Sequence, residues 1–409
     1  MNYGLIGKKL GHSYSKSIHE KLGNAQYILK EIPENEIEIF FKKREFKAIN
    51  VTIPYKKNAF SACDELSDTA KAIGSVNVVI KRDNGTLYGD NTDAFGFEYM
   101  MDSANIDPAG KKCIVLGSGG SSVMAQYVLK KRGAASVTVI SRSGEDNYEN
   151  IAKHKDAEII VNTTPVGMYP ENGVSAIDLS MFEQCIGVID LIYNPMRTKL
   201  ISDALEKNIP CVSGLVMLVA QAKRAHELFF DKISETDIME LTENIAAGMK
   251  NILLVGMPGS GKSTIAKLLA QKTGRELIDT DDEIVKSEQR SIPDIFKNDG
   301  EAAFRAIETK ILKEVTKKSG CIIACGGGVV TIPENMPLLR QNSTVFRIDR
   351  PLDQLATEGR PLSGEKGVLA LFEARDALYA KAADYTIKFN SADAMCDEIL
   401  KILGIEAKI

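Results

Sequence analysis

The sequence predicts an α/β protein with two or more domains, and three observations carry this prediction. The chain has 409 residues, more than the roughly 250 to 300 at which one hydrophobic core usually stops growing. Short runs rich in β-branched residues alternate with longer stretches whose apolar residues recur at helical spacing. Two units, residues 112–133 and 251–274, join a strand to a helix through a glycine-rich turn. Such alternation predicts parallel strands covered by helices.

The expected strands are short buried runs that precede a turn or a helix. They cover residues 48–54, 111–117, 136–141, 158–164, 187–193, 251–256 and 321–328. The stretches 121–133 and 263–274 have helical spacing and a glycine near the end. The polar stretch 230–250 is expected to form one surface helix that ends at Gly248. We place a domain boundary there.

Composition and charge narrow the class of protein. Hydrophobic residues make up 44% and charged residues 26%, the net charge is −4 and the pI is near 5.8. Without a basic field, no nucleic-acid partner is expected, whereas small anionic ligands fit. No apolar run has the length of a signal peptide or a membrane span, so we expect a cytoplasmic protein with no membrane partner. The seven cysteines form no CxxC pair, and buried thiols are expected.

The opening of the second half carries the first chemical motif. Gly256, Gly261, Lys262 and Ser263 match G-x-x-x-x-G-K-[ST] between a strand and a helix. Backbone N–H groups of such a P-loop cradle phosphates, the lysine reaches the β and γ oxygens, and the serine ligates Mg²⁺. Gly259 and Thr264 belong to the same nucleotide-binding loop and helix start. The cofactors expected here are ATP and Mg²⁺.

Acidic residues, arginines and glycines follow the P-loop in a characteristic order. "LIDTDDEI" places Asp279 and Asp281 two residues apart after a short strand, and so on one side of the chain. "DGEAAFRAIE", "CGGGVV", "EGRPLSG" and "FEARDALY" come next. Taken singly, each arginine would be a solvated surface residue. In this order, the set resembles the shikimate kinase family over about residues 250–405.

The resemblance assigns expected roles in this second half. Asp279 would hold Mg²⁺ through water, and Asp281 would orient the shikimate hydroxyl. Arg305 and Arg375 would grip the substrate carboxylate, since a planar guanidinium donates two parallel hydrogen bonds. Arg360 would stabilise the transferring phosphoryl group. The backbone of Gly326, Gly327 and Gly328 would approach the sugar-like ring closely. One departure is that the segment before Arg360 is shorter than a usual lid and lacks its other arginine.

The first half contains a second glycine turn. "CIVLGSGGSSVMAQYVLKKRG" places Gly117, Gly119 and Gly120 between a strand and a helix. The next strand ends in Ser141, Arg142 and Ser143, where an NAD-binding unit usually has an acidic residue. Because a guanidinium favours a 2′-phosphate, a Rossmann unit that binds NADP(H) is expected.

Further segments of this half resemble the shikimate dehydrogenase family over about residues 1–247. They are "GHSYSKSIHE", "INVTIPYKK", "IGSVNVV", "YGDNTDAFG", "NTTPVGM", "DLIYNP" and "GLVMLVAQA". The resemblance implies that Lys56 and Asp93 are the catalytic pair at the reacting oxygen. A lone lysine would otherwise be a surface charge, and Asp93 an ordinary N-cap. Lys16 stands where the family usually has proline.

The remaining site residues implied by this resemblance fall into two groups. The substrate would be bound by Ser13, Ser15, Thr52, Asn77, Tyr193 and Gln221. The nicotinamide and its ribose would be flanked by Asn162, Thr163, Thr164, Gly214 and Met217.

Together the two resemblances imply a bifunctional fusion. A dehydrogenase substrate domain (1–104 plus 215–247) would surround a Rossmann NADP-binding domain (105–214), and a P-loop kinase domain (249–409) would follow. The first part would reduce 3-dehydroshikimate to shikimate, and the second would phosphorylate shikimate. Three alternatives stay open: a quinate or NAD preference, a regulator that senses shikimate and nucleotides without catalysis, and a fusion with one inactive half. The sequence leaves the oligomeric state open.

Overall fold

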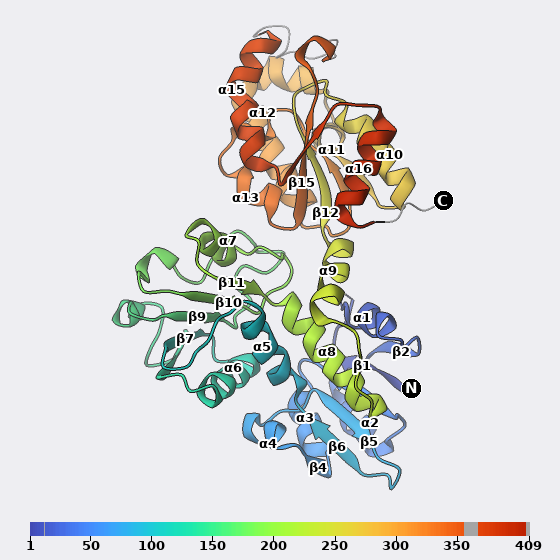
Figure 1. Cartoon of the computed structure of the whole chain (residues 1–409), viewed down its shortest axis with the longest axis vertical. Coiled ribbons are helices and arrows are strands. Elements are labelled where there is room, and N and C mark those ends of the chain that lie inside the picture. Colours follow the sequence, from blue (N-terminus) through green and yellow to red (C-terminus); the bar gives the residue numbers. More distant parts are fainter. Residues whose placement is uncertain (12, 356–366, 406–409) are drawn as a thin grey trace. The chain divides into compact units, whose positions relative to one another are not determined.

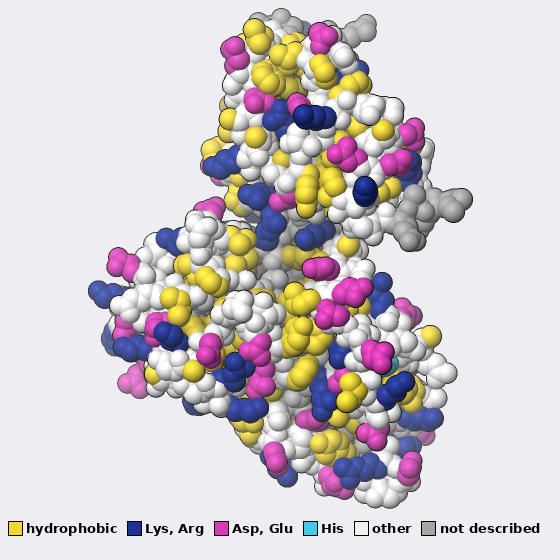
Figure 2. Space-filling view, viewed as in Figure 1, with side chains coloured by type: hydrophobic (Ala, Val, Ile, Leu, Met, Phe, Trp, Pro, Cys, Tyr) yellow, Lys and Arg dark blue, Asp and Glu magenta, His cyan; other side chains and the backbone are white. Residues whose placement is uncertain are grey.

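The computed structural model describes residues 1–11, 13–355 and 367–405. The chain divides into two compact units, Met1–Ile245 and Ala246–Ile409, which are coloured from blue to green and from yellow to red in Figure 1. Each unit has hydrophobic clusters of its own. On the face shown in Figure 2, basic and acidic side chains are interspersed over both units. The finer division of the first unit into a substrate domain and a cofactor domain stays a prediction.

The first sheet of the first unit has six strands in the order β2-β1-β3-β5-β6-β4. Its strands are β1 (Tyr3–Gly7), β2 (Tyr27–Glu31), β3 (Ala48–Val51), β4 (Glu65–Leu66), β5 (Val78–Lys81) and β6 (Leu87–Asp90). β1 runs parallel to β2 and β3, whereas β5 is antiparallel to β3 and β6. This sheet is therefore mixed, which the alternation of strands and helices did not indicate.

Helices cover this sheet and return to it late in the chain. They are α1 (Ser15–Lys21), α2 (Ile37–Lys43), α3 (Lys56–Ala62), α4 (Asp68–Ile73) and α5 (Thr92–Ser103), with η1 (Glu34–Glu36) before α2. The long helix α8 (Leu215–Phe230) packs against α5, α1, β3 and β5. The chain thus leaves the first sheet after α5 and comes back to it through α8 (Figure 1).

The second sheet is formed between these two visits. Its five parallel strands have the order β11-β10-β9-β7-β8. They are β7 (Lys112–Leu116), β8 (Ser136–Ile140), β9 (Ile159–Asn162), β10 (Gly187–Asp190) and β11 (Cys211–Ser213). The accompanying helices are α6 (Gly120–Lys131), α7 (Lys199–Glu206), η2 (Ile151–His154) and η3 (Leu179–Met181). Strands β9 and β10 are buried throughout, as parallel strands covered on both faces must be.

The expectation of one helix over 230–250 is wrong. Helix α8 ends at Phe230, because Asp231 adopts a left-handed conformation with φ of 47°. Helix α9 (Ile238–Met249) begins only after Asp237, whose side chain accepts a hydrogen bond from the N–H of Glu240. It ends at Met249, one residue beyond the predicted Gly248, and it has buried apolar residues such as Leu241.

The second unit contains five parallel strands in the order β13-β14-β12-β15-β16. They are β12 (Asn251–Val255), β13 (Leu277–Asp279), β14 (Ile322–Ala324), β15 (Ser343–Asp349) and β16 (Tyr385–Lys388). The α-helices are α10 (Lys262–Thr273), α11 (Thr280–Glu288), α12 (Ile292–Val315), α13 (Asn335–Arg340), α15 (Val368–Ala382) and α16 (Ala392–Leu403), with 3-10 turns η4 (Val329–Thr331) and η5 (Leu352–Gln354). Strand β12 is entirely buried and is the middle strand of the five. The residues that follow it therefore lie at the middle of the carboxyl edge of the sheet.

Candidate active sites

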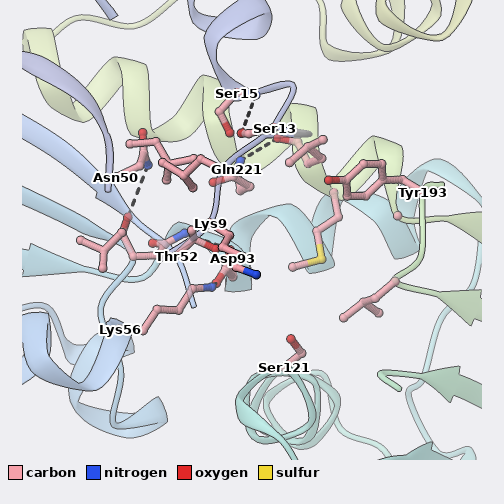
Figure 3. Close-up of a pocket in the computed structure, with 18 of the residues that line it drawn as sticks. Lys9, Ser13, Ser15, Asn50, Thr52, Lys56, Asp93, Ser121, Tyr193 and Gln221 are labelled. Carbon is pink, nitrogen blue, oxygen red and sulfur yellow. Dashed lines mark hydrogen bonds and ion pairs between the residues drawn. The ribbon is translucent and has the colours of Figure 1, made fainter. Parts of the chain in front are cut away.

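A polar cavity of about 440 Å³ lies in the first unit. Its lining comes from the loop before α1, the end of β3, the starts of α3, α5 and α8, and the loop after β10. Figure 3 shows the predicted residues Ser13, Ser15, Thr52 and Gln221 among the side chains at this cavity. The fold therefore brings together residues that are up to about two hundred positions apart in the sequence.

Lys56 and Asp93 form an ion pair at this cavity. Lys56 is the first residue of α3, and its Nζ lies 2.5 Å from Oδ2 of Asp93 at the start of α5. Asn77 donates to the other carboxylate oxygen, Oδ1, at 2.9 Å. Asn91, and not Asp93, caps α5, because its side chain accepts the N–H of Asp93. The carboxylate of Asp93 is thus held between an ammonium and an amide, and the alternative of an ordinary N-cap is wrong.

The loop before α1 and the helix α8 supply further polar groups. Ser13 accepts the N–H of Ser15 at its hydroxyl, which fixes the turn that presents both serines. Gln221 projects from α8 and donates to the carbonyl of Leu218 in its own helix. Ser13, Ser15 and Gln221 line the same cavity as the Lys56–Asp93 pair (Figure 3).

The segments that follow strands β10 and β11 contribute another wall of the cavity. Tyr193, Gly214 and Met217 all line the cavity. The ring of Tyr193 meets the ring of Tyr14 edge to face, with centroids 6.2 Å apart, and burial raises the pKa of Tyr193. A Cβ on Gly214 would lie 2.0 Å from the carbonyl oxygen of Leu191, so glycine is required at this point.

The glycine turn after β7 has the form that a dinucleotide needs. Gly117 has φ of 101°, and a Cβ there would lie 2.9 Å from Thr164 and 3.0 Å from the hydroxyl of Thr163. At Gly119 and Gly120, a Cβ would project into open space at the N-terminus of α6. The turn thus leaves room above the helix for a ligand, which suits a pyrophosphate.

The predicted cofactor residues on the neighbouring strands lie outside the lining of the cavity. Asn162 is buried, donates to Asp190 and accepts from Thr164, and Thr163 donates to the carbonyl of Leu116. After β8, Ser141 is buried, whereas Arg142 and Ser143 are exposed. Asn162 and Thr163 therefore hold the edge of the sheet together, and Arg142 is free to reach a ligand at the surface.

The P-loop of the second unit follows the central strand. Its three predicted glycines, Gly256, Gly259 and Gly261, have φ of 147°, 82° and 95°, which only glycine adopts without strain. Lys262 is buried, and its ammonium donates to the carbonyls of Gly256 and Met257, both at 2.9 Å. Ser263 and Thr264 are exposed in the first turn of α10.

Two aspartates near this loop follow β13, which β14 separates from β12 in the sheet. Strand β13 ends at Asp279, which caps α11, so the strand spacing that we expected to align the two aspartates does not extend to Asp281. Asp279 accepts from the hydroxyl of Ser263 at 2.7 Å and from the N–H of Asp281 at 3.0 Å. Burial, with the charges of Asp279 and Glu308, raises the pKa of Asp281 to about 6. The three groups offer hydroxyl and carboxylate oxygens of the kind that Mg²⁺ prefers.

The glycine turn after β14 is packed against these groups. A Cβ on Gly326 would lie 2.7 Å from Glu308 and 2.8 Å from Asp281, and one on Gly328 would lie 2.1 Å from Arg305. On Gly327 it would lie 2.7 Å from the ring of Pro258 in the P-loop. Gly327 is therefore constrained by the rigid ring of Pro258, whereas a side chain at Gly326 or Gly328 would displace the ends of the Glu308, Asp281 or Arg305 side chains.

Arg305 and Arg375 are both buried at this turn. Arg305 donates to Glu308 at 2.6 Å and to Glu301 at 3.3 Å. Arg375 donates to the carbonyl of Gly327 at 3.1 Å. The predicted Arg360 lies outside the described residues.

Among the residues that the structure describes, no cluster of three or more His, Cys, Asp or Glu residues forms a metal site. No helix among them has the length and apolar character needed to cross a membrane.

Several residues at the two sites were not predicted, among them Lys9 and Ser121, which also line the first cavity (Figure 3). Asn50 lines the first cavity, where its Oδ1 accepts from the buried hydroxyl of Tyr27 at 2.8 Å. Glu308, with 1% exposure, pairs with Arg305, and Tyr379 donates to the carbonyl of Gly327. Two features of the sequence could have indicated Asn50 and Glu308. Asn50 is a polar residue inside an apolar strand, and Glu308 lies three positions after the site residue Arg305, on the same helix face.

The folds and sites define a class for each unit. The first is a two-sheet α/β unit with a dinucleotide-type turn and an ammonium–carboxylate pair in a polar cavity. The second is a P-loop unit with carboxylates and buried arginines at the carboxyl edge of its sheet. Such features are typical of a nicotinamide-dependent oxidoreductase and of a small-molecule kinase.

Comparison with known proteins agrees with both classes. The family model for the shikimate dehydrogenase substrate binding domain matches residues 5–79, and that for shikimate kinase matches residues 258–404. The chain is 35% identical over 266 residues to "Shikimate dehydrogenase (NADP(+))" of Clostridium perfringens, an alignment that covers 58% of this chain and 97% of the relative.

Solved structures give the same result for the first unit. Shikimate dehydrogenase 1 from Peptoclostridium difficile is 35% identical with a TM-score of 0.54, and the match covers 60% of this chain and 98% of that one. A chorismate mutase/shikimate 5-dehydrogenase fusion protein from Clostridium acetobutylicum is 34% identical with a TM-score of 0.55, covering 59% and 96%. The chain therefore belongs to the shikimate dehydrogenase family through its first unit, and it carries a shikimate kinase domain in its second.

Proposed function

We propose that the first unit reduces 3-dehydroshikimate to shikimate with NADPH, and that the second phosphorylates shikimate with ATP to give shikimate 3-phosphate. The family assignments support a bifunctional enzyme of the shikimate pathway and do not favour a quinate-specific or non-catalytic protein. The observation that carries the first activity is the Lys56–Asp93 pair in the polar cavity. For the second, it is the P-loop with Asp281 and the two buried arginines beside it.

In the first unit, Lys56 acts at the carbonyl that is reduced. NADPH, when bound, supplies the hydride, and its pyrophosphate fits the open space at Gly119 and Gly120. Negative charge then develops on the carbonyl oxygen, where the Lys56 ammonium stabilises it and donates the proton. Asp93, itself held by Asn77, keeps that ammonium in place. Ser13 and Ser15 bind the substrate carboxylate, while Thr52, Asn77, Gln221 and Tyr193 surround the ring hydroxyls.

In the second unit, Asp281 acts at the shikimate hydroxyl. Its raised pKa of about 6 lies close to neutral pH, where a carboxylate accepts a proton most effectively. Arg305 and Arg375 bind the substrate carboxylate. Lys262 and the P-loop N–H groups hold the phosphates, and Ser263 and Asp279 supply oxygens to Mg²⁺ directly or through water. With these groups in place, ATP and Mg²⁺ supply the phosphoryl group and its charge neutralisation.

A coupled assay on the intact chain tests this proposal. We expect 3-dehydroshikimate, NADPH, ATP and Mg²⁺ to yield shikimate 3-phosphate, with shikimate accumulating when ATP is omitted. Lys56→Ala should abolish NADPH oxidation but leave shikimate phosphorylation intact, and Lys262→Ala should do the reverse. Parallel rates with quinate and with NADH test the alternative preference. No phosphorylated product from shikimate at saturating ATP would overturn the kinase assignment, including the role of Arg360.

A further inference from the structure

In the sheet of the second unit, different strands flank the two sides of β12 and of the P-loop that follows it. On one side of β12 lie β14 and β13, whose carboxyl ends carry the glycine turn 326–328 and Asp279. All of the proposed shikimate-binding groups are on this side. Because the terminal phosphate must face the acceptor, the rest of a bound nucleotide would extend toward the other side, where β15 and β16 end.

Arg350 occupies that second side. It follows directly after β15, and this strand end is packed on the P-loop, since a Cβ on Gly256 would lie 2.6 Å from the carbonyl oxygen of Ile348. Nη1 of Arg350 lies 3.8 Å from the position that a Cβ on Gly261 would occupy. The guanidinium carbon is 4.1 Å from the ring centroid of Phe389, which follows β16. The Phe389 ring thus contacts the guanidinium beside the phosphate loop.

No acidic partner neutralises Arg350 among the described residues. Its Nε is buried and has no hydrogen-bond partner there. By contrast Arg347, three residues earlier, pairs with Asp376 at 2.5 Å and with Asp349 at 3.2 Å. A buried donor of a charged group is costly to leave unsatisfied, and such a cost is common where a ligand supplies the partner.

We propose that Arg350, stacked on Phe389, forms the base-side wall of the nucleotide site. One face of the guanidinium rests on the Phe389 ring, and the other stacks on the adenine, with its edge close to the phosphate next to the ribose. This inference rests on the proposed kinase function. It makes Arg350 a nucleotide-binding residue with no part in binding shikimate.

Calorimetric titration of the intact chain tests the inference with ligands that differ in one part. Arg350→Gln should weaken ADP and ATP binding at least about 10-fold, because stacking and charge are lost together. Inorganic tripolyphosphate, which lacks adenine and ribose, should lose clearly less affinity than ADP, because it loses the charge contact but has no base to stack. Shikimate binding and the rate of the dehydrogenase should be unchanged. The matched control is Arg340→Gln, which removes an arginine that is 44% exposed and pairs with Asp384.

Each contrary result has a distinct meaning. Equal losses for ADP and tripolyphosphate would show that Arg350 acts only on the phosphates, and unchanged ADP binding would show that it does not face the nucleotide; either overturns the inference. A parallel loss of shikimate binding would indicate a structural role and would also overturn it. Arg350→Lys keeps the charge but cannot stack as a plane, so it should restore less than half of the lost binding energy. If the wild-type chain binds no ATP at all, the proposed kinase function fails as well.

Discussion

Asp281 is a half-buried carboxylate beside other negative charges, and its ionisation opposes folding. Its folded-state pKa of about 6 is above the ordinary 3.8, and burial is the main cause. A carboxyl group whose pKa is raised by folding is protonated more readily in the folded state, so its ionisation opposes folding. The penalty is absent below about pH 4, grows between the two pKa values, and is complete above pH 6.

Asp281→Asn should therefore stabilise the second unit while it removes kinase activity. We expect the free energy of unfolding to rise by roughly 1–3 kcal/mol at pH 8, with the gain vanishing below about pH 4. Chemical denaturation at several pH values measures it. Asp282→Asn, at an exposed neighbour on the same helix turn, should give no such gain. A loss of stability at pH 8 would contradict this account of Asp281.

Lys56 offers the corresponding test in the first unit. If its ammonium stabilises the developing oxyanion and donates the proton, Lys56→Ala should lower dehydrogenase kcat by at least about 100-fold, with kinase activity unchanged. Steady-state kinetics of NADPH oxidation measures this. Lys57→Ala, which removes the exposed next residue of α3, is the matched control and should retain normal kcat. A Lys56 variant with most of its kcat would refute the assignment.

Among the elements of the first unit, we expect the turn after β8 to set the preference for one nicotinamide cofactor. Arg142 and Ser143 place an exposed guanidinium and a hydroxyl directly after the strand, where an NAD-binding unit usually has an acidic residue. The same elements carry the rest of the cofactor site, because the turn after β7 and the N-terminus of α6 leave open space at Gly119 and Gly120. Cofactor preference should therefore depend on the turn and not on the cavity.

Arg142→Ala should raise the KM for NADPH at least about 10-fold, because a charge-assisted pair with the 2′-phosphate is lost. The KM for NADH and the KM for 3-dehydroshikimate should change little. Initial rates with both cofactors make this measurement, and Lys155→Ala, another exposed cation of the same unit, is the control. Equal increases for NADPH and NADH would assign Arg142 a structural role instead.

At the scale of the whole molecule, the chain consists of two compact units, each with its own sheets and hydrophobic clusters. Helix α9 and strand β12 follow each other with one residue between them. Arg275 donates to the carbonyls of Ala247 and Lys250, so the end of α9 is tied to the second unit. Each unit has a complete set of the proposed site residues.

Scanning calorimetry of the intact chain should therefore show two unfolding transitions that respond to different ligands. A ligand at about 100 times its Kd stabilises its own unit by about 2.7 kcal/mol, which corresponds to roughly 5 to 10 °C. NADP⁺ should shift one transition, and ADP with Mg²⁺ the other. Lys262→Ala should remove the ADP response and keep the NADP⁺ response. A single transition that both ligands move would show that the units unfold as one.

The sequence predicted the parts of each site that are local in the chain. The P-loop residues 256–264 were identified because the glycines and the lysine that bind phosphate lie within nine consecutive positions. The structure gives those glycines positive φ. The resemblance to the shikimate dehydrogenase family supplied Lys56 and Asp93 as a pair, which the structure brings to 2.5 Å. Asn50, Glu308 and Tyr379 were missed, because each owes its position to a partner that only the fold brings near.

The pattern of residues was enough to predict a two-part α/β protein with a dinucleotide turn and a P-loop, because strand periodicity and glycine spacing are properties of short segments. The antiparallel β5, the raised pKa of Asp281 and the contact of Arg350 with Phe389 are visible only in the folded chain. Each of these depends on burial or on contacts between distant segments. Neither can be read from a local pattern, because the free energy of a charge or an aromatic ring is set by what the folded chain places around it.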